Sequence, residues 1–187
     1  MKRIKWNDGW TFSKPSGNPL MEMIGGGPKG EPVTLPHDAM IHETRTQATK
    51  NAHQTGFYPG GVYAYTREFD APEDWKDKAV LFEFEGVYQN AMVYINGDYA
   101  GGHPYGYTNF YVRADDFLRF GARNEIKVTV NNSAEPNSRW YSGSGVYRDV
   151  NLLLGGRLRI VEEGLRVTAT DIGPDSAVIE VDTRILN

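Results

Sequence analysis

The chain contains 187 residues, with 20 basic and 24 acidic side chains and a formal net charge of −4. This length suits one domain plus a remainder, and it can bury a sizeable core. Like charges form no block of five or more, which argues against a nucleic-acid surface or a polybasic membrane anchor. The sequence has no cysteine, which excludes disulfides, cysteine-ligated metals and thiol catalysis.

No apolar run approaches the ~18 residues that a membrane-spanning helix needs. The first nine residues are basic, but no apolar stretch follows them, so they do not form a signal peptide. We therefore expect a cytoplasmic protein, or a periplasmic or secreted one if a leader has been removed.

Residues 1 to about 60 show little periodicity and carry several turn signals, such as the glycine-rich stretch 25–30. We expect this segment to wrap around the core with long loops. From Val62 the pattern changes to period two, and residues 62–69 predict a strand.

Residues 79–85 predict a second strand, because Val80, Phe82 and Phe84 alternate with more polar positions. We expect the opposite face, which carries Glu83 and Glu85, to be solvated.

A hairpin is predicted at Asn96 and Gly97, because a type I′ turn needs positive φ at both central positions. Further strands are predicted over 109–113, 125–130 and 146–154, with one helical turn over 114–120 that is capped near Asp115 or Asp116. On the strand 146–154, Arg148 shares a face with Val146 and Val150. We therefore expect its stem to be buried and its charge to be paired.

After Gly156 a new unit begins, with three strands predicted over 158–161, 165–170 and 177–186. Three strands are too few for a sandwich of about seven. We therefore divide the chain into residues 1–156 and 157–187, and expect the second unit to be cut short. Closely spaced strands with almost no helix predict an all-β, antiparallel sandwich, of which a jelly roll is the preferred form.

No catalytic constellation is evident in the sequence. The acidic pairs at 83/85, 115/116 and 162/163 fit an exposed sheet face, a turn and a surface junction. The four histidines match no metal-ligand spacing, and no Gly-x-Ser-x-Gly motif is present. We assign no catalytic residue and no metal site.

The polar loop 131–145 is the one chemically unusual stretch, because it combines amides, a guanidinium and two aromatic rings. Such groups can bind sugar hydroxyls and stack on the C–H face of a sugar. An interface loop with a core-filling tryptophan explains the composition equally well, and both interpretations stay open at this point.

Three blocks of the chain, residues 86–97, 101–110 and 137–150, resemble the N-terminal domain of glycoside hydrolase family 2, and the β-galactosidase type most of all. Residues 35–38 and 65–69 fit the same resemblance. It implies a galactose-binding-like jelly roll over 1–156. It also implies that 157–187 open an immunoglobulin-like sandwich, which a TIM barrel follows.

The resemblance implies that both catalytic glutamates lie on that barrel, so this chain alone is not an active enzyme and needs no cofactor. The parent would be a retaining β-glycosidase, a β-galactosidase in the first place, with β-glucuronidase and β-mannosidase left open. The implied partners are a β-galactoside or a related carbohydrate, and the two further domains of the same polypeptide.

By the same resemblance, the loop after residue 136 reaches the sugar pocket. Arg139 with Asn137 or Ser138 would bind hydroxyls, while Trp140 and Tyr141 would shape the wall. A second loop would contribute Asn51. The alternatives are a free-standing carbohydrate-binding module, to which the aromatic residues are suited, and a purely structural domain.

Overall fold

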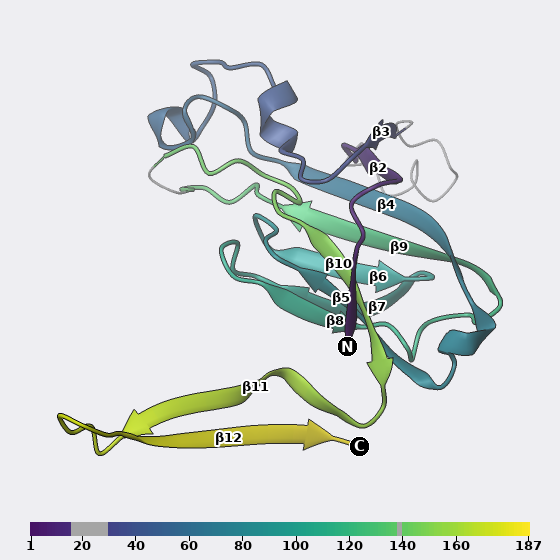
Figure 1. Cartoon of the computed structure of the whole chain (residues 1–187). Coiled ribbons are helices and arrows are strands. Elements are labelled where there is room, and N and C mark those ends of the chain that lie inside the picture. The colour runs from purple at the N-terminus through teal and green to yellow at the C-terminus, as the bar shows by residue number, and fades with distance from the viewer. Residues whose placement is uncertain (16–29, 138–139) are drawn as a thin grey trace.

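The computed structural model describes residues 1–15, 30–137 and 140–187, and it consists mainly of two antiparallel sheets packed face to face (Figure 1). The four-stranded sheet contains, in spatial order, β1 (Lys2–Lys5), β10 (Val150–Gly156), β5 (Lys78–Phe84) and β8 (Phe110–Arg113). The six-stranded sheet contains β3 (Glu31–Val33), β2 (Trp10–Ser13), β4 (Val62–Ala71), β9 (Ala122–Asn131), β6 (Ala91–Ile95) and β7 (Asp98–His103). The predicted all-β sandwich is confirmed.

Short 3-10 helices occupy the connections: η1 (Ala39–His42), η2 (Ala52–Thr55) and η3 (Glu73–Trp75). No helix in the described ranges is long and apolar enough to cross a membrane. Residues 114–120 form a hydrogen-bonded turn rather than a helix, in which Leu118 N–H donates to Ala114 O at 3.1 Å. Asp115 there accepts a hydrogen bond from Arg113.

The core lies between the sheets and follows the predicted alternation. Val80, Phe82 and Phe84 are fully buried, and the Phe84 ring stacks on Phe110 with centroids 5.0 Å apart. The predicted hairpin is also confirmed, because Asn96 and Gly97 join β6 to β7 with φ of 53° and 91°.

The N-terminal segment holds three strands that periodicity did not reveal, because each has only three or four residues. β1 pairs with β10 in one sheet, whereas β2 pairs with β4 in the other. The first 13 residues therefore run from one sheet to the other and pair with a strand in each. The predicted loop at 25–30 lies outside the described residues, apart from Gly30.

The prediction for Arg148 is wrong. β10 begins only at Val150, because Val146 and Gly145 bond to His37 and Tyr88 instead of entering the sheet. Arg148 consequently lies on an irregular stretch with its side chain exposed, and its guanidinium carbon is 5.3 Å from the Tyr147 ring centre.

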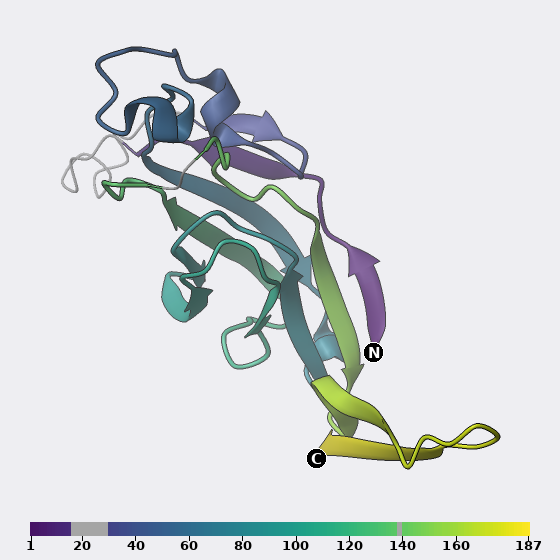
Figure 2. The same ribbon diagram turned by 90° about the vertical axis from the view of Figure 1, so that its left-hand side faces the viewer.

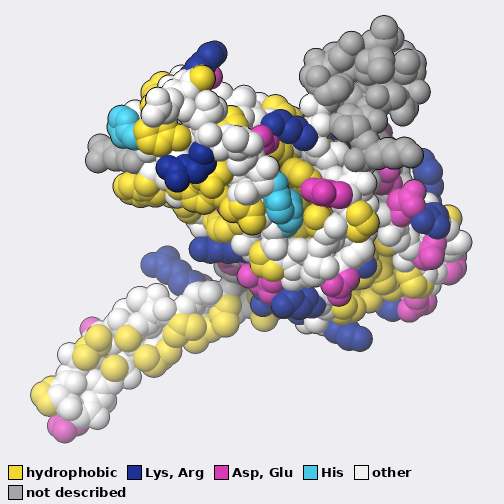
Figure 3. Space-filling model, turned by 90° about the horizontal axis from the view of Figure 1, so that it is seen from above, with side chains coloured by type: hydrophobic (Ala, Val, Ile, Leu, Met, Phe, Trp, Pro, Cys, Tyr) yellow, Lys and Arg dark blue, Asp and Glu magenta, His cyan; other side chains and the backbone are white. Residues whose placement is uncertain are grey.

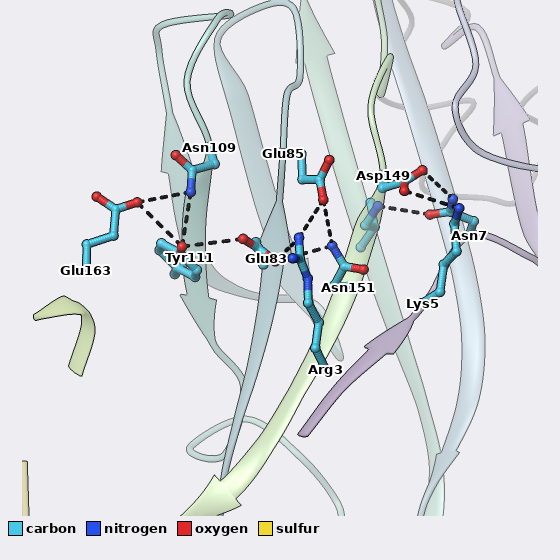
Figure 4. A network of polar contacts seen from close by, with 11 residues as sticks. Arg3, Lys5, Asn7, Glu83, Glu85, Asn109, Tyr111, Asp149, Asn151 and Glu163 are labelled. Carbon is cyan, nitrogen blue, oxygen red and sulfur yellow. Dashed lines mark hydrogen bonds and ion pairs between the residues drawn. The ribbon is translucent and has the colours of Figure 1, made fainter. Parts of the chain in front are cut away.

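The expectation of a solvated outer face on β5 is also wrong at Glu83, which is only 8% exposed. Its carboxylate contacts Arg3 at 2.9 Å, Asn151 at 3.2 Å and the Tyr111 hydroxyl at 3.4 Å (Figure 4). Arg3 bridges onward to Glu85 at 2.5 Å. The outer face is thus covered by a polar network contributed by four strands.

Beyond β10, residues 157–187 form two strands rather than the predicted three, because 158–161 and 165–170 belong to one strand with a bulge. β11 (Arg159–Thr170) pairs with β12 (Val178–Leu186) in a sheet of their own. Figure 2 shows this hairpin extending away from the sandwich. In the bulge, Glu163 has φ of 54°, and its carboxylate accepts from the Asn109 amide at 3.1 Å.

Candidate functional site

Two irregular segments meet at one end of the sandwich, the first between β3 and β4 and the second between β9 and β10 (Figure 1). Backbone hydrogen bonds join them: His37 N–H donates to Val146 O at 2.9 Å, and Ala39 N–H donates to Ser144 O at 2.8 Å. The strands of the sandwich end here. The two loops therefore need not follow the regular hydrogen-bond pattern of the sheets, while the strands hold the ends of each loop in place.

Asn51 lies directly against the second segment, with its side chain only 7% exposed. Its amide nitrogen donates to Ala134 O at 3.2 Å, and its amide oxygen accepts from the Asn137 N–H at 3.0 Å. The structure thus brings together two of the candidate residues. In this geometry the Asn51 amide braces the loop, because both of its ends bond to backbone.

Asn132 is a residue that sequence reasoning passed over, and it is almost completely buried. Its oxygen accepts from the Asn137 side-chain amide at 2.7 Å, while its nitrogen donates to Gly143 O at 3.2 Å. Asn132 therefore ties the two ends of the loop together. Asn132 lies within the loop 131–145 that composition marks, but it is one of several amides there, and nothing in the sequence singles it out.

Asp38 was likewise missed as a site residue. One carboxylate oxygen accepts from Met40 N–H and Ser144 N–H, both at 2.9 Å, and the other accepts from the Tyr141 hydroxyl. Gly143 lies so close that a Cβ there would be 2.8 Å from the Asp38 carboxylate, and its φ of 71° also favours glycine. Asp38 thus fixes the backbone of the loop and the direction of one aromatic side chain.

Tyr141 and Trp140 lie at the surface, next to the hydrogen-bonded residues described above. Trp140 is 64% exposed, and the Tyr141 ring packs against Tyr58 with centroids 5.3 Å apart. Burial, and then the bond to the Asp38 carboxylate, raises the pKa of the Tyr141 hydroxyl, so it stays a neutral donor near pH 7. Ser138 and Arg139, two further candidates, lie outside the described residues.

A pocket of about 320 Å³ opens beside Asn51. It is bordered by Thr46, Thr49, Ser133 and Glu135, among others, and Glu135 forms an ion pair with Lys50 at 3.3 Å. Ala48, Pro59 and Gly60 complete the lining, so the pocket combines polar and apolar groups. In the described part of the chain, no three His, Cys, Asp or Glu side chains gather in a way that could hold a metal ion.

The fold and the sequence match one family. A family model for the glycosyl hydrolases family 2 sugar binding domain matches residues 43–155. The chain belongs to glycoside hydrolase family 2, as an N-terminal sugar-binding domain.

Among curated proteins, it is 36% identical over 155 residues to the β-galactosidase BoGH2A of Bacteroides ovatus, which covers 83% of this chain and 18% of that protein. It is 29% identical, over 83% of this chain and 15% of that protein, to a putative β-glucuronidase of Formosa agariphila. The chain thus spans less than a fifth of the length of both relatives.

Among solved structures, a β-glycosidase from Bacteroides vulgatus matches all of this chain and 24% of its own, with a TM-score of 0.86 and 31% identity. A putative β-galactosidase from Bacteroides fragilis matches 98% of this chain and 28% of its own, with a TM-score of 0.83 and 28% identity. The fold therefore recurs as one part of larger glycosidases.

Proposed function

We propose that this chain positions a sugar for a retaining β-glycosidase whose catalytic glutamates lie elsewhere on the same polypeptide, and that the parent enzyme is a β-galactosidase. The observation that carries the proposal is the braced loop: the side chains of Asn51, Asn132 and Asp38 form hydrogen bonds with its described residues Ala134, Asn137, Tyr141, Gly143 and Ser144. These bonds hold the loop so that the side chains of Trp140 and Tyr141 lie at the surface. A scaffold of this kind suits a sugar wall, because catalysis is sensitive to errors of about 1 Å in substrate position.

The choice of β-galactosidase over β-glucuronidase is supported by the greater identity to BoGH2A than to the putative β-glucuronidase. Both activities occur among the names of the relatives, so the two substrates belong in one experiment. A p-nitrophenyl β-galactoside and the matching β-glucuronide would be supplied to the full-length protein. The proposal requires faster turnover of the galactoside.

The loop assignment is tested in the same full-length enzyme by Arg139→Ala, with Arg123→Ala as the control. Arg123 is an exposed residue at the far end of β9, where it pairs with Glu68. We expect Arg139→Ala to lower kcat/KM by about 100-fold without lowering the unfolding midpoint, because a misplaced sugar reacts slowly. Unchanged kinetics in Arg139→Ala, or an equal loss in Arg123→Ala, would contradict the proposal.

We also propose that residues 157–187 begin an immunoglobulin-like sandwich. One face of the hairpin is apolar along its length, and hydrophobic side chains follow one another on it (Figure 3). The register places on this face Ile160, Leu165, Val167, Ile179, Val181 and Ile185, each more than half exposed. A face of this kind normally packs on a second sheet. In a longer protein we expect these six side chains to be buried and the backbone amides of β11 and β12 to exchange hydrogen more slowly than in the 187-residue chain.

A further inference from the structure

Two tyrosines lie at the surface in the connection between β7 and β8. They are outside the loop 131–145, which we call the candidate loop. Tyr105 is 57% exposed and Tyr107 is 43% exposed, and their rings meet edge to face with centroids 5.5 Å apart. Neighbouring exposed aromatic rings on a soluble protein commonly mark a contact surface. Nothing in the sugar-positioning role described above uses them.

The connection is held rigidly by buried neighbours. Gly106, between the two tyrosines, lies on the Tyr88 ring, where a Cβ would be 2.2 Å from a ring carbon. Its carbonyl accepts from the Tyr147 hydroxyl at 2.7 Å. The backbone between the two tyrosines is thus positioned before any ligand arrives, which lowers the entropy that binding would cost.

This pair is continuous with the candidate loop. The Tyr107 hydroxyl donates to Ser142 Oγ at 3.1 Å, and Ser142 Oγ donates in turn to Trp140 O at 3.4 Å. Ser142 thus links the Tyr107 hydroxyl to the backbone of the candidate loop at Trp140. A ligand that contacts the loop at Ser142 and extends along the surface would reach Tyr107 and then Tyr105.

The chemistry of the surface points to a neutral ligand with flat apolar faces and a polar rim. The connection, residues 104–109, contains no charged side chain of its own; its charged neighbours are Glu163, which accepts from Asn109, and Arg148, which lies beside the Tyr147 ring. A tyrosine ring offers an apolar face and a hydroxyl tip, which match the C–H face and the hydroxyls of a sugar. We propose that Tyr105 and Tyr107 bind the further sugar units of a β-linked oligosaccharide whose terminal unit lies at the candidate loop.

The proposal rests on the proposed function for the place of the terminal sugar, but its contact surface lies wholly within this chain. It can therefore be tested on the 187-residue chain by NMR, with β-1,4-linked galactotetraose as the probe. Galactose and maltotetraose, which is an α-linked glucan, are the controls. We expect the galactotetraose to shift the ring signals of Tyr105 and Tyr107 with a Kd of about 1 mM, and each control to bind at least about tenfold more weakly.

Variants locate the contact. We expect Tyr105→Ala to weaken galactotetraose binding at least about fivefold, because an aromatic contact is lost. Tyr107→Phe should retain binding, since it keeps the ring and gives up only the bond to Ser142. The matched control is Tyr99→Ala on β7, where a tyrosine of similar exposure, 58%, lies outside the surface.

Ring signals that stay unshifted at galactotetraose concentrations of about 10 mM, well above the expected Kd, would overturn the proposal. Equal binding of maltotetraose, or equal weakening by Tyr99→Ala, would also overturn it. The outcome is separable from the kinetic test. Galactotetraose can bind Tyr105 and Tyr107 while Arg139→Ala leaves kcat/KM unchanged, in which case only the proposed function fails.

Discussion

The side-chain oxygen of Asn51 accepts the backbone N–H of Asn137 at 3.0 Å, across 86 residues of sequence. The same amide donates to Ala134 O, so one buried side chain fixes both ends of a four-residue stretch. A residue of the neighbouring loop, between β3 and β4, therefore helps to hold the conformation of the candidate loop.

Replacing Asn51 by alanine should destabilise the chain by about 1–2 kcal/mol, because two hydrogen bonds from a buried side chain are lost, although water can reach the exposed Ala134 and the partly exposed Asn137. Asn51→Asp should cost at least as much, because its second carboxylate oxygen cannot donate to Ala134 O and would face that carbonyl. Urea unfolding of both variants measures the difference. Equal stability of Asn51→Ala and the unaltered chain would show that the brace contributes nothing.

The Asp38 carboxylate makes three hydrogen bonds, to two backbone N–H groups and the Tyr141 hydroxyl. Asp38→Ala should lower the free energy of unfolding by about 2 kcal/mol or more, because bonds to a charged acceptor are the stronger kind. It should also let the pKa of Tyr141 fall toward its ordinary value, since the carboxylate helps to raise it. Urea unfolding and NMR titration of the tyrosine ring report the two effects. An unchanged Tyr141 pKa would count against this bond.

Glu83 and Glu68 offer a matched comparison of buried and exposed ion pairs. Glu83→Ala should cost about 1–3 kcal/mol, because Asn151 and Tyr111 lose a buried acceptor; the exposure of Arg3 keeps the cost below that of a fully buried pair. Glu68→Ala removes a pair with Arg123 whose side chains are more than half exposed, so it should cost under about 1 kcal/mol. Equal costs in urea unfolding would contradict the burial argument.

The stability of the chain should fall as the pH is lowered through the range of His37. Burial, and then the neighbouring His42, lowers the pKa of His37. The unfolded chain therefore takes up this proton at a higher pH than the folded one. The contribution is complete above the ordinary pKa of about 6.5 and declines below it. His37→Gln should lose less stability than the unaltered chain between pH 7.5 and 5.5, and an identical loss in both would contradict the assignment.

Sequence patterns predicted the elements whose signal is local. The hairpin at Asn96 follows from two residues that tolerate positive φ, and the buried face of β5 follows from period two. The patterns failed where contacts between residues far apart in the sequence determine the structure. β1 has four residues and no alternation, yet it is held because it pairs with β10. Glu83 alternates like a surface residue, but Arg3, 80 positions earlier, covers it.

The candidate site shows the same difference between local sequence signals and long-range contacts. The unusual composition of 131–145 marked the loop, and family resemblance added Asn51. Asp38 and Asn132 lie in stretches that these signals marked, but their roles could not be predicted, because they arise from contacts that only the folded chain makes. An aspartate before a short helix and an amide after a strand each have ordinary local explanations.

The central claim is that this chain serves a larger glycosidase of which it is one part. The most direct measurement is the size of the native protein, by blotting a lysate of the source organism with an antibody raised against this chain. We predict a band several times larger than the 21.0 kDa of these 187 residues. A band at 21 kDa would contradict the account, and sugar binding by the free chain would then become the function to measure.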